Sequence, residues 1–487
     1  MTDILAALLE ACERTPKVPA MTLGRRTLTY GDLRARILGI AAALTVRGLE
    51  PGDRVLFSVR PGLDGICLAL GVIAAGGTIV FADPGAGEAM FRARAGLAAP
   101  KWVAAESLLY AASSGPLRRV ARSRGLELPD YGSVVPEARH IYAGPWLPGV
   151  PKGAIPLRRL RGRASVLLGK PGDEALVIFT SGTTAHPKAV VHSRASLGTG
   201  LGDFAEHVGF VPGEVVLTDQ LMVGIPALIS GAHWVLPPAG ADPGAKPDKY
   251  LPLLTNADVL FAVPAALDAL LRSGVAAPHL RALLVGGAPV LRPLLERARA
   301  QLPGTVIRAI YGMTEILPVA IADGDEKLAF DGPGDYVGEL MSAVAARIDD
   351  GELVVSGPGL ALGYLGDAQL TELRTGDLAR LENDRLILGG RSKDMFIRGT
   401  TNVYPGLYEP IIAGIPGVDE AALVGVPNAI GDDELVLVIV GDASRVAAAL
   451  PGLIDAAVLP DRIVVLDALP KKGRSSKLDR DALQELL

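Results

Sequence analysis

The chain has 487 residues, of which 49% are hydrophobic and 21% are charged, and its formal net charge is -5 at pH 7. This length and hydrophobic content predict a globular protein with more than one domain. The small net charge and the lack of a dense Lys/Arg block argue against nucleic acid or an anionic membrane as a partner. The two cysteines, Cys12 and Cys67, lie in apolar stretches without a disulfide or metal pattern, so we expect buried thiols.

The first apolar segments raise the question of a signal or a membrane span. Residues 1–17 carry acidic side chains and lack the basic start and cleavage site of a secretory signal, so a cytoplasmic location is expected. Residues 65–82 are long and apolar, but Gly76 and Gly77 interrupt them and β-branched residues follow. This pattern favours a buried helix and then a buried strand, with no membrane span.

Strand-like runs alternate with helix-like segments over most of the chain, which predicts an α/β architecture. The runs at 53–59, 173–180 and 280–287 each precede such a helical segment. We expect mainly parallel sheets flanked by helices. Residues 142–163, rich in Pro, Gly and Arg, are predicted to form an irregular connection between two lobes.

The pattern changes near Gly390 to short strands and turns, and then to a smaller α+β unit. The predicted organisation is a large N-terminal domain over residues 1–390 and a small C-terminal domain over residues 391–487. The large domain consists of lobes with mainly parallel sheets flanked by helices, and the small α+β domain is expected to be mobile.

A loop with the sequence IFTSGTTAHPKAV at residues 178–190 has the composition of a phosphate-binding segment. Gly182 and Lys188 have the spacing of a Walker A motif, but Pro187 and Ala189 occupy its Gly and Ser/Thr positions, so that motif is excluded. Hydroxyl groups, backbone N–H groups and a lysine after a strand can still surround a phosphate. On these residues alone, a polar surface loop is the alternative.

Further motifs follow the loop in a characteristic order: GGAP at 286–289, YGMTE at 311–315, GELVVSGPGLALGYLGD at 351–367, RTGD at 374–377, GGRSKD at 389–394 and RSSKLDR at 474–480. With the loop, they resemble the adenylate-forming superfamily, which includes acyl-CoA synthetases, luciferases and the adenylation domains of peptide synthetases. The resemblance begins at LTYGDLRARILGIAAAL, residues 28–44, and spans nearly the whole chain. It is closest in character to the acyl-CoA ligases.

The resemblance assigns a nucleotide site. Tyr311 is expected to stack on adenine, and Asp377 to accept hydrogen bonds from the ribose hydroxyls with Arg391 nearby. Three residues are the expected catalytic groups: Thr314 on phosphate, Glu315 as the Mg²⁺ ligand, and Lys477 on the α-phosphate and carboxylate. The expected nucleotide-binding residues also include Thr180, Ser181, Gly182, Thr183, Thr184, Lys188, Gly287, Ala288, Gly312 and Met313. Without the resemblance, the segment around Lys477 is also typical of a solvated basic tail.

Residues 218–231 correspond to a wall of the acyl pocket in this superfamily. Their small apolar side chains favour a bulky hydrophobic carboxylate. The expected acyl-site residues are Asp219, Met222, Gly224, Gly286, Gly287 and Gly312. Alternatively, Asp219 pairs with the α-amine of an amino acid. His192 and His207 match no catalytic pattern and are expected to be structural.

The resemblance implies an acyl-CoA ligase that uses ATP, Mg²⁺ and coenzyme A. A carboxylate attacks the α-phosphate of ATP, and the small domain then turns near Lys393 so that the CoA thiol can attack the acyl-adenylate. Two alternatives stay open. One is a stand-alone amino-acid or acyl adenylation enzyme that loads a carrier protein, and the other is a catalytically inactive adenylate-binding relative.

Several positions depart from the superfamily pattern. Ala185 and Ala189 replace loop glycines, which predicts a poor fit for the β- and γ-phosphates of ATP. The enzyme would then act mainly in thioesterification, on an acyl-adenylate that an upstream adenylating enzyme supplies. Ser476 replaces the glycine before the C-terminal lysine, and Thr400 replaces a glycine near the thiol tunnel of relatives.

Overall fold

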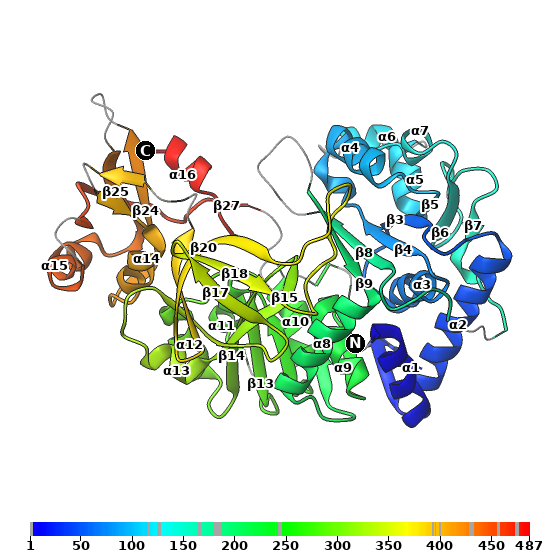
Figure 1. The fold of residues 1–487 in the computed structure, drawn as a ribbon, viewed down its shortest axis with the longest axis horizontal. Coiled ribbons are helices and arrows are strands. Elements are labelled where there is room, and N and C mark those ends of the chain that lie inside the picture. Colours follow the sequence, from blue (N-terminus) through cyan, green and yellow to red (C-terminus); the bar gives the residue numbers. More distant parts are fainter. Residues whose placement is uncertain are drawn as a thin grey trace. The chain divides into compact units, whose positions relative to one another are not determined.

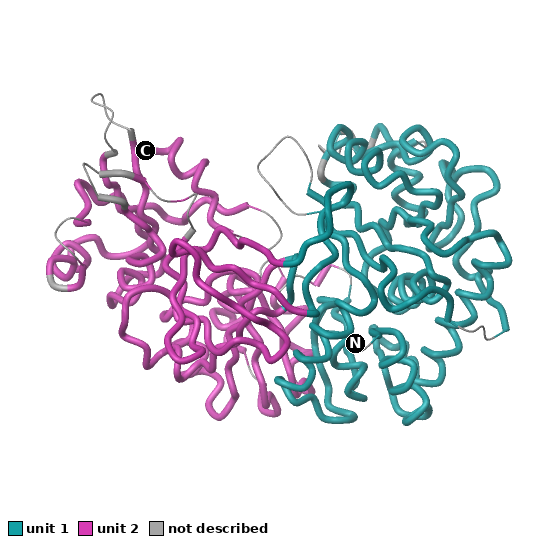
Figure 2. The backbone as a smooth tube through the Cα atoms, viewed as in Figure 1, with its two compact units in different colours: residues 1–238, 314–317, 358–371 teal, residues 239–313, 318–357, 372–487 magenta. Residues whose placement is uncertain are grey.

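The structure is a computed structural model that describes the chain except residues 1–2, 115–116, 124–127, 164–166, 180–187, 239, 242–245, 276, 392–393, 395, 399–400, 428–432, 455–457 and 473–476. The described residues form two compact units of helices and strands (Figures 1 and 2). Unit 1 comprises residues 1–238, 314–317 and 358–371, and unit 2 comprises residues 239–313, 318–357 and 372–487. The expected α/β class is confirmed in both units.

An eight-stranded sheet forms the centre of unit 1, in the order β19-β9-β8-β4-β3-β5-β6-β7. The neighbours from β8 to β7 pair in parallel, whereas β9 pairs antiparallel with both β8 and β19. The prediction of mainly parallel pairing is confirmed in this sheet. Its strands are β3 (Arg54–Ser58), β4 (Thr78–Phe81), β5 (Trp102–Glu106), β6 (Arg139–Ala143), β7 (Ile155–Pro156), β8 (Glu174–Phe179), β9 (Ala189–Ser193) and β19 (Gly363–Tyr364).

A second set of strands in unit 1 has the order β10-β11-β1-β2, with β10 (Val215–Leu217), β11 (His233–Leu236), β1 (Pro19–Leu23) and β2 (Arg26–Thr29). The helices of this unit are α1 (Ile4–Arg14), α2 (Tyr30–Val46), α3 (Leu63–Ala74), α4 (Glu88–Ala98), α5 (Ser107–Ser113), α6 (Arg118–Ser123), α7 (Tyr131–Val134), α8 (Arg194–Val208) and α9 (Leu221–Ile229). Two 3-10 helices, η1 (Pro84–Ala86) and η2 (Leu157–Arg159), complete it.

The apolar segment 65–82 forms the buried helix and buried strand that its sequence predicts, because α3 ends before Gly76 and β4 follows Gly77. Gly76 has φ +79°, a conformation that glycine adopts without strain. No helix in the described part of the chain has both the length and the hydrophobicity needed to cross a bilayer. Both cysteines are free and buried, and burial raises the pKa of each thiol to about 12.

The segment 142–163 differs in role from its prediction. It is largely irregular, as expected, with the last two residues of β6, then β7 and η2, inside it. It does not join two lobes, because β6 before it and β8 after it belong to the same sheet. The pairing of β8 with β4, distant in sequence, decides this, and no local pattern in the segment reports that pairing.

Unit 2 contains strands in the order β17-β18-β20-β21-β16-β15-β14-β13-β12. The pairs β12–β13 and β13–β14 are parallel, and those from β15 to β17 are antiparallel. The strands are β12 (Val259–Ala262), β13 (Ala282–Gly286), β14 (Val306–Met313), β15 (Ile316–Asp323), which begins with two residues of unit 1, β16 (Asp335–Leu340), β17 (Ala345–Asp349), β18 (Glu352–Ser356), β20 (Leu373–Glu382) and β21 (Arg385–Arg391). The helices α10 (Pro247–Leu254), α11 (Pro264–Arg272), α12 (Arg292–Gln301) and α13 (Gly324–Ala329) accompany them.

The C-terminal part of unit 2 has its own buried clusters, whose fully buried members all lie between Val403 and Leu483. A local core of this kind is what a small α+β domain requires. The boundary near Gly390 lies inside unit 2 and stays a prediction. The elements here are β22 (Phe396–Arg398), β23 (Thr401–Val403), α14 (Pro405–Ala413), β24 (Val418–Pro427), β25 (Asp433–Gly441), α15 (Ala443–Leu453), β26 (Arg462–Val465), β27 (Lys471–Lys472), β28 (Lys477–Leu478) and α16 (Arg480–Glu485).

Candidate nucleotide site

Two of the residues expected to hold adenosine are in direct contact within unit 2. Tyr311, near the end of β14, donates a hydrogen bond of 2.6 Å from its hydroxyl to Oδ2 of Asp377 in β20. Asp377 is only 4% exposed. The antiparallel register of β20 and β21 places Arg391 opposite Asp377. The structure therefore brings together three positions that lie far apart in the sequence.

The RTGD segment of β20 holds the backbone of Asp377 in place. The Thr375 hydroxyl donates to the Leu353 carbonyl at 2.9 Å, and its oxygen accepts the Asp377 N–H at 3.1 Å. Gly376, at φ +73°, donates its N–H to the Glu352 carboxylate at 2.8 Å. The Asp377 carboxylate thus belongs to a strand segment whose polar groups are bonded to β18.

A second group of residues lies within unit 1 and includes Glu315. The Tyr364 hydroxyl donates to Glu315 Oε1 at 2.8 Å, and the Ala361 N–H donates to the Glu315 carbonyl at 2.8 Å. Glu315 is therefore held through both its side chain and its backbone. No role was expected for Tyr364 from the sequence, although this residue lies in the string GYLGD of the motif at 351–367.

His192 anchors Thr314, which is one of the expected catalytic residues. Its Nε2 lies 2.7 Å from the Thr314 carbonyl oxygen, and because a carbonyl can only accept, Nε2 carries the proton. Burial lowers the pKa of His192, so the ring is neutral and Nδ1 accepts from the Ser196 hydroxyl at 3.1 Å. The structural role expected for this histidine agrees with these contacts.

The phosphate loop is described only at its two ends, residues 178–179 and 188–190. Thr180, Ser181, Gly182, Thr183, Thr184 and Ala185 lie outside the described residues. Lys188 directly precedes β9, its side chain is exposed, and its Nζ lies 5.3 Å from the centroid of the Tyr364 ring. This contact is a cation–π interaction between the loop lysine and the tyrosine that holds Glu315.

Ala189 contradicts the sequence argument about loop glycines. It is the first residue of β9, it is not among the residues with positive φ, and its side chain is 1% exposed within a hydrophobic cluster. Its methyl group therefore packs into the core and does not strain the backbone. The expectation that this position needs positive φ was wrong, because Ala189 starts β9 and pairs with β8, and its effect on ATP stays a prediction.

The remaining residues that are expected to bind the nucleotide lie in the GGAP turn and at the end of β14. Gly286 is buried, and a Cβ there would lie 3.0 Å from the Ile310 carbonyl oxygen, so a side chain would require a shift of β14. Gly287 has φ +87°, which favours glycine. Ala288 is half-buried after it, and Gly312 and Met313 are half-buried at the end of β14.

The expected acyl-site residues differ in their surroundings. Asp219 is exposed and accepts a hydrogen bond from the side chain of Gln220 at 2.9 Å, and Met222 packs against the core. A Cβ on Gly224 would lie 2.2 Å from the ring of Trp234. This buried indole, which sequence reasoning missed, occupies the space that the glycine leaves.

The C-terminal lysine and the hinge lie in the last part of unit 2. Lys477 has an exposed side chain in β28, which pairs with β27. Lys393 lies outside the described residues. Arg480, three residues after Lys477, forms ion pairs with Glu409 at 2.7 Å and with Asp394 at 3.4 Å. The segment of the expected catalytic lysine is thus tied to the residue that follows the expected hinge.

Glu315 is the residue expected to hold a nucleotide-bound Mg²⁺. Within the described ranges, no group of three or more His, Cys, Asp or Glu side chains is arranged to hold a metal. Mg²⁺ in nucleotide sites is commonly held by one or two carboxylates together with phosphates and water. Tyr364 occupies Oε1 of Glu315, and no residue in the described part of the chain bonds to Oε2, so this oxygen can serve as the protein ligand.

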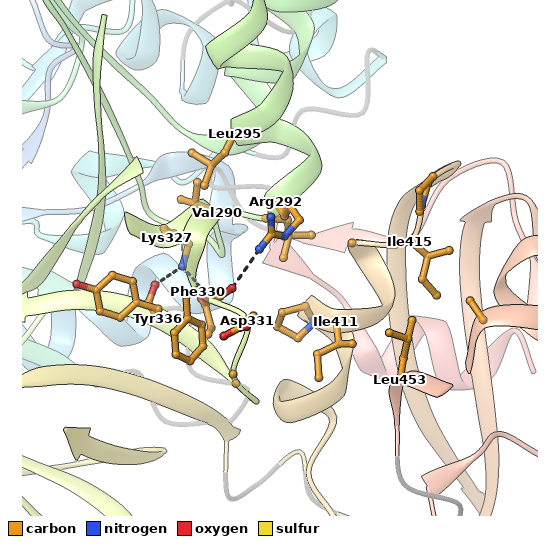
Figure 3. Close-up of a pocket in the computed structure, with 18 residues that line it drawn as sticks. Val290, Arg292, Leu295, Lys327, Phe330, Asp331, Tyr336, Ile411, Ile415 and Leu453 are labelled. Atoms are coloured by element: carbon orange, nitrogen blue, oxygen red, sulfur yellow. Dashed lines mark hydrogen bonds and ion pairs between the residues drawn. The ribbon is translucent and has the colours of Figure 1, made fainter. Parts of the chain in front are cut away.

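A cavity of about 340 Å³ lies elsewhere in unit 2 (Figure 3). Its walls are mainly apolar, with Leu295, Phe330 and Ile415 among them. The cations in it are already bonded, because Arg292 donates to the Phe330 carbonyl at 3.1 Å and Lys327 pairs with Asp335. None of the expected site residues lines this cavity, so it is separate from the candidate nucleotide site.

Comparison with known proteins decides the family. A family model for the AMP-binding enzymes matches residues 8–365. The chain belongs to this family. As a member of the AMP-binding family, it is an adenylate-forming enzyme of the ligase type, which implies the use of ATP or AMP, and the resemblance seen in its motifs is confirmed.

Relatives of this AMP-binding chain include 3-[(3aS,4S,7aS)-7a-methyl-1,5-dioxo-octahydro-1H-inden-4-yl]propanoyl:CoA ligase of Mycobacterium tuberculosis, which is 27% identical over 100% of this chain and 99% of the relative. Isonitrile lipopeptide synthase of Streptomyces coeruleorubidus is 30% identical over 94% of this chain but only 32% of its own length. The crystal structure of apo MatB from Rhodopseudomonas palustris has 25% identity and a TM-score of 0.77, with 100% of this chain and 99% of MatB covered.

Proposed function

We propose that this enzyme is an acyl-CoA ligase that converts a hydrophobic carboxylic acid into its CoA thioester through an acyl-adenylate. The observation that carries the proposal is the extent of similarity to the propanoyl:CoA ligase, which covers 100% of this chain and 99% of the relative. Matches to the peptide synthases cover 40%, 8% and 32% of those proteins. CoA is therefore favoured over a carrier protein as the thiol acceptor.

The geometry in unit 2 supports a role in holding adenosine. Asp377 is nearly buried and oriented by Tyr311, and a carboxylate in this position is suited to accept hydrogen bonds from the ribose hydroxyls. The Tyr311 ring offers a flat surface for adenine. We assign Thr314 to a phosphate oxygen and Lys477 to the charge that develops when the carboxylate attacks.

Glu315, through Oε2, is the residue that would hold Mg²⁺. When bound, the ion supplies positive charge that offsets the charge of the phosphates. Lys188, exposed at the end of the loop, supplies a second positive charge from the chain itself. His192 fixes the carbonyl of Thr314, so that the residue next to the metal ligand keeps its position.

The acid is proposed to be bulky and apolar. Residues 218–231 are small and apolar, and the buried indole of Trp234 packs against Gly224 from the neighbouring strand. The relative from Mycobacterium tuberculosis is named for a propanoyl group on a fused octahydroindene ring. An acid with a compact ring system is therefore a sensible first substrate to test.

The proposal also concerns the relative rates of the two half-reactions, adenylation and thioesterification. We propose that thioesterification is the stronger half and that another enzyme can supply the acyl-adenylate. Among the two alanines, only Ala185 supports a weakened adenylation half-reaction, because the methyl group of Ala189 is packed in the core. From the resemblance to acyl-CoA ligases, we assign CoA as the acceptor thiol and a rotation of the C-terminal domain near Lys393.

The deciding experiment supplies the enzyme with ATP, Mg²⁺, CoA and a panel of ring-containing acids, and measures AMP release and the thioester mass. In parallel, a synthetic acyl-adenylate is offered with CoA or with a phosphopantetheinylated carrier protein. CoA thioester formation in either assay supports the proposal. Loading of the carrier alone supports the carrier-loading alternative, amino-acid-dependent pyrophosphate exchange supports a role for Asp219, and inertness in every assay supports an inactive relative.

A further inference from the structure

We infer that Tyr364 is a positioning residue that orients Glu315 for Mg²⁺ and holds Lys188 beside it. The inference rests on the proposed function, in which Glu315 is the Mg²⁺ ligand and Lys188 faces phosphate. It concerns a residue outside the expected catalytic and nucleotide-binding set. Three independent contacts of the segment 358–371 carry it.

The first contact fixes the carboxylate. The Tyr364 hydroxyl bonds to Glu315 Oε1 at 2.8 Å, while the Ala361 N–H bonds to the Glu315 carbonyl at 2.8 Å. With one oxygen bonded and the backbone held, Glu315 offers Oε2 in a single orientation.

The second contact fixes the strand that leaves the phosphate loop. β19 pairs antiparallel with β9, with Tyr364 opposite Val190. The Leu365 N–H donates to the Ala189 carbonyl, and the Leu362 N–H donates to the Val191 carbonyl, both at 2.8 Å. Tyr364 is therefore mounted directly on the strand that begins one residue after Lys188.

The third contact concerns the lysine itself. Lys188 Nζ lies 5.3 Å from the centre of the Tyr364 ring, within the range of a cation–π interaction. The Tyr364 side chain thus contacts the Glu315 carboxylate through its hydroxyl and the Lys188 ammonium group through its ring. Residues that orient a metal ligand in this way commonly change metal affinity about 10- to 100-fold when they are mutated.

The test measures nucleotide binding rather than turnover. Calorimetry gives the affinity for ATP with and without Mg²⁺, and the affinity for AMP without Mg²⁺. We expect Mg²⁺ to increase the ATP affinity of the unmodified protein, and Tyr364→Phe to reduce that increase about tenfold. The AMP affinity of the variant is expected to be unchanged, because Tyr311 and Asp377 are untouched.

The chain offers a matched control. Tyr336 donates to Glu326 at the same distance, 2.8 Å, in unit 2. Tyr336→Phe removes an equivalent Tyr–Glu hydrogen bond, and we expect it to leave the Mg²⁺-dependent gain unaltered. A double variant, Tyr364→Phe with Glu315→Gln, should lose no more of the gain than Glu315→Gln alone, because both changes act on one ligand.

The outcomes separate this inference from the proposed function. An undiminished Mg²⁺ gain in Tyr364→Phe, or an equal loss of ATP and AMP affinity, overturns the positioning role while leaving the nucleotide site intact. Thermal unfolding of the variant shows whether an equal loss comes from reduced stability. If the unmodified protein binds no nucleotide, the proposed function fails, and the role of Tyr364 fails with it.

Discussion

Tyr311 donates a hydrogen bond of 2.6 Å to Asp377, a carboxylate that is 4% exposed. Removing a carboxylate from water is costly unless its oxygens are bonded, and the Tyr311 phenol meets part of that requirement. The Asp377 side chain is consequently held in place by the protein alone. The site needs little reorganisation when a ribose binds, and a preorganised site of this kind favours affinity.

Replacing Asp377 with alanine should weaken the binding of AMP or of a non-hydrolysable acyl-adenylate by about 1–3 kcal/mol, because the ribose hydroxyls lose a charged acceptor. Titration calorimetry measures the difference. Tyr311→Phe is the matched comparison, since it keeps the ring but removes the bond to Asp377, and it should cost less than Tyr311→Ala. Unchanged affinity in Asp377→Ala would show that the ribose is held elsewhere.

The two loop alanines should behave differently when changed to glycine. Ala185→Gly is expected to increase ATP–pyrophosphate exchange, and relief of ~3 kcal/mol in the transition state would raise the rate more than a hundredfold. Ala189→Gly should leave exchange unaltered and lower the free energy of unfolding by roughly 0.5–1 kcal/mol, because a residue within β9 becomes more flexible. Robust exchange by the unmodified protein would refute a weakened adenylation half-reaction.

Acidification should destabilise the fold through a buried histidine in β6. Burial lowers the pKa of His140, and its Nδ1 lies 3.1 Å from the Tyr110 hydroxyl. Because the native ring resists protonation and the unfolded ring does not, the unfolded chain binds more protons below about pH 6.5. The free energy of unfolding is expected to fall as the pH drops from 7 to 5.

The comparison variant is His140→Gln, whose amide oxygen can still accept a hydrogen bond from the Tyr110 hydroxyl. It should be less stable than the unmodified protein at pH 8 and show a shallower loss of stability on acidification. Urea unfolding at several pH values gives both quantities. Equal pH slopes for the two proteins would contradict the assignment of this linkage to His140.

Limited proteolysis should cut the chain near the predicted boundary at Gly390. The residues after it have their own buried clusters, so a fragment released there can retain a core. Mass spectrometry of the fragments locates the cut. Cleavage confined to residues 142–163, which connect two strands of one sheet, would count against a separate C-terminal lid.

The sequence by itself determined the class of fold and the family. Alternating strand and helix patterns are local, and the glycines between α3 and β4 end one element and allow the next without reference to the rest of the chain. The order of short motifs, from the phosphate loop to Lys477, was also visible in the sequence. A chain's local backbone preferences and its linear spacing are both present before it folds.

Only the tertiary structure decided which of these residues meet. Ala189 was read as a loop residue, but its pairing with β8 makes it the start of a strand and buries its methyl group. Tyr364 contacts Glu315 because β19 pairs with β9, and Gly224 is required by the indole of Trp234. Such contacts join residues distant in sequence, so packing determines them and no periodicity within a short window can reveal them.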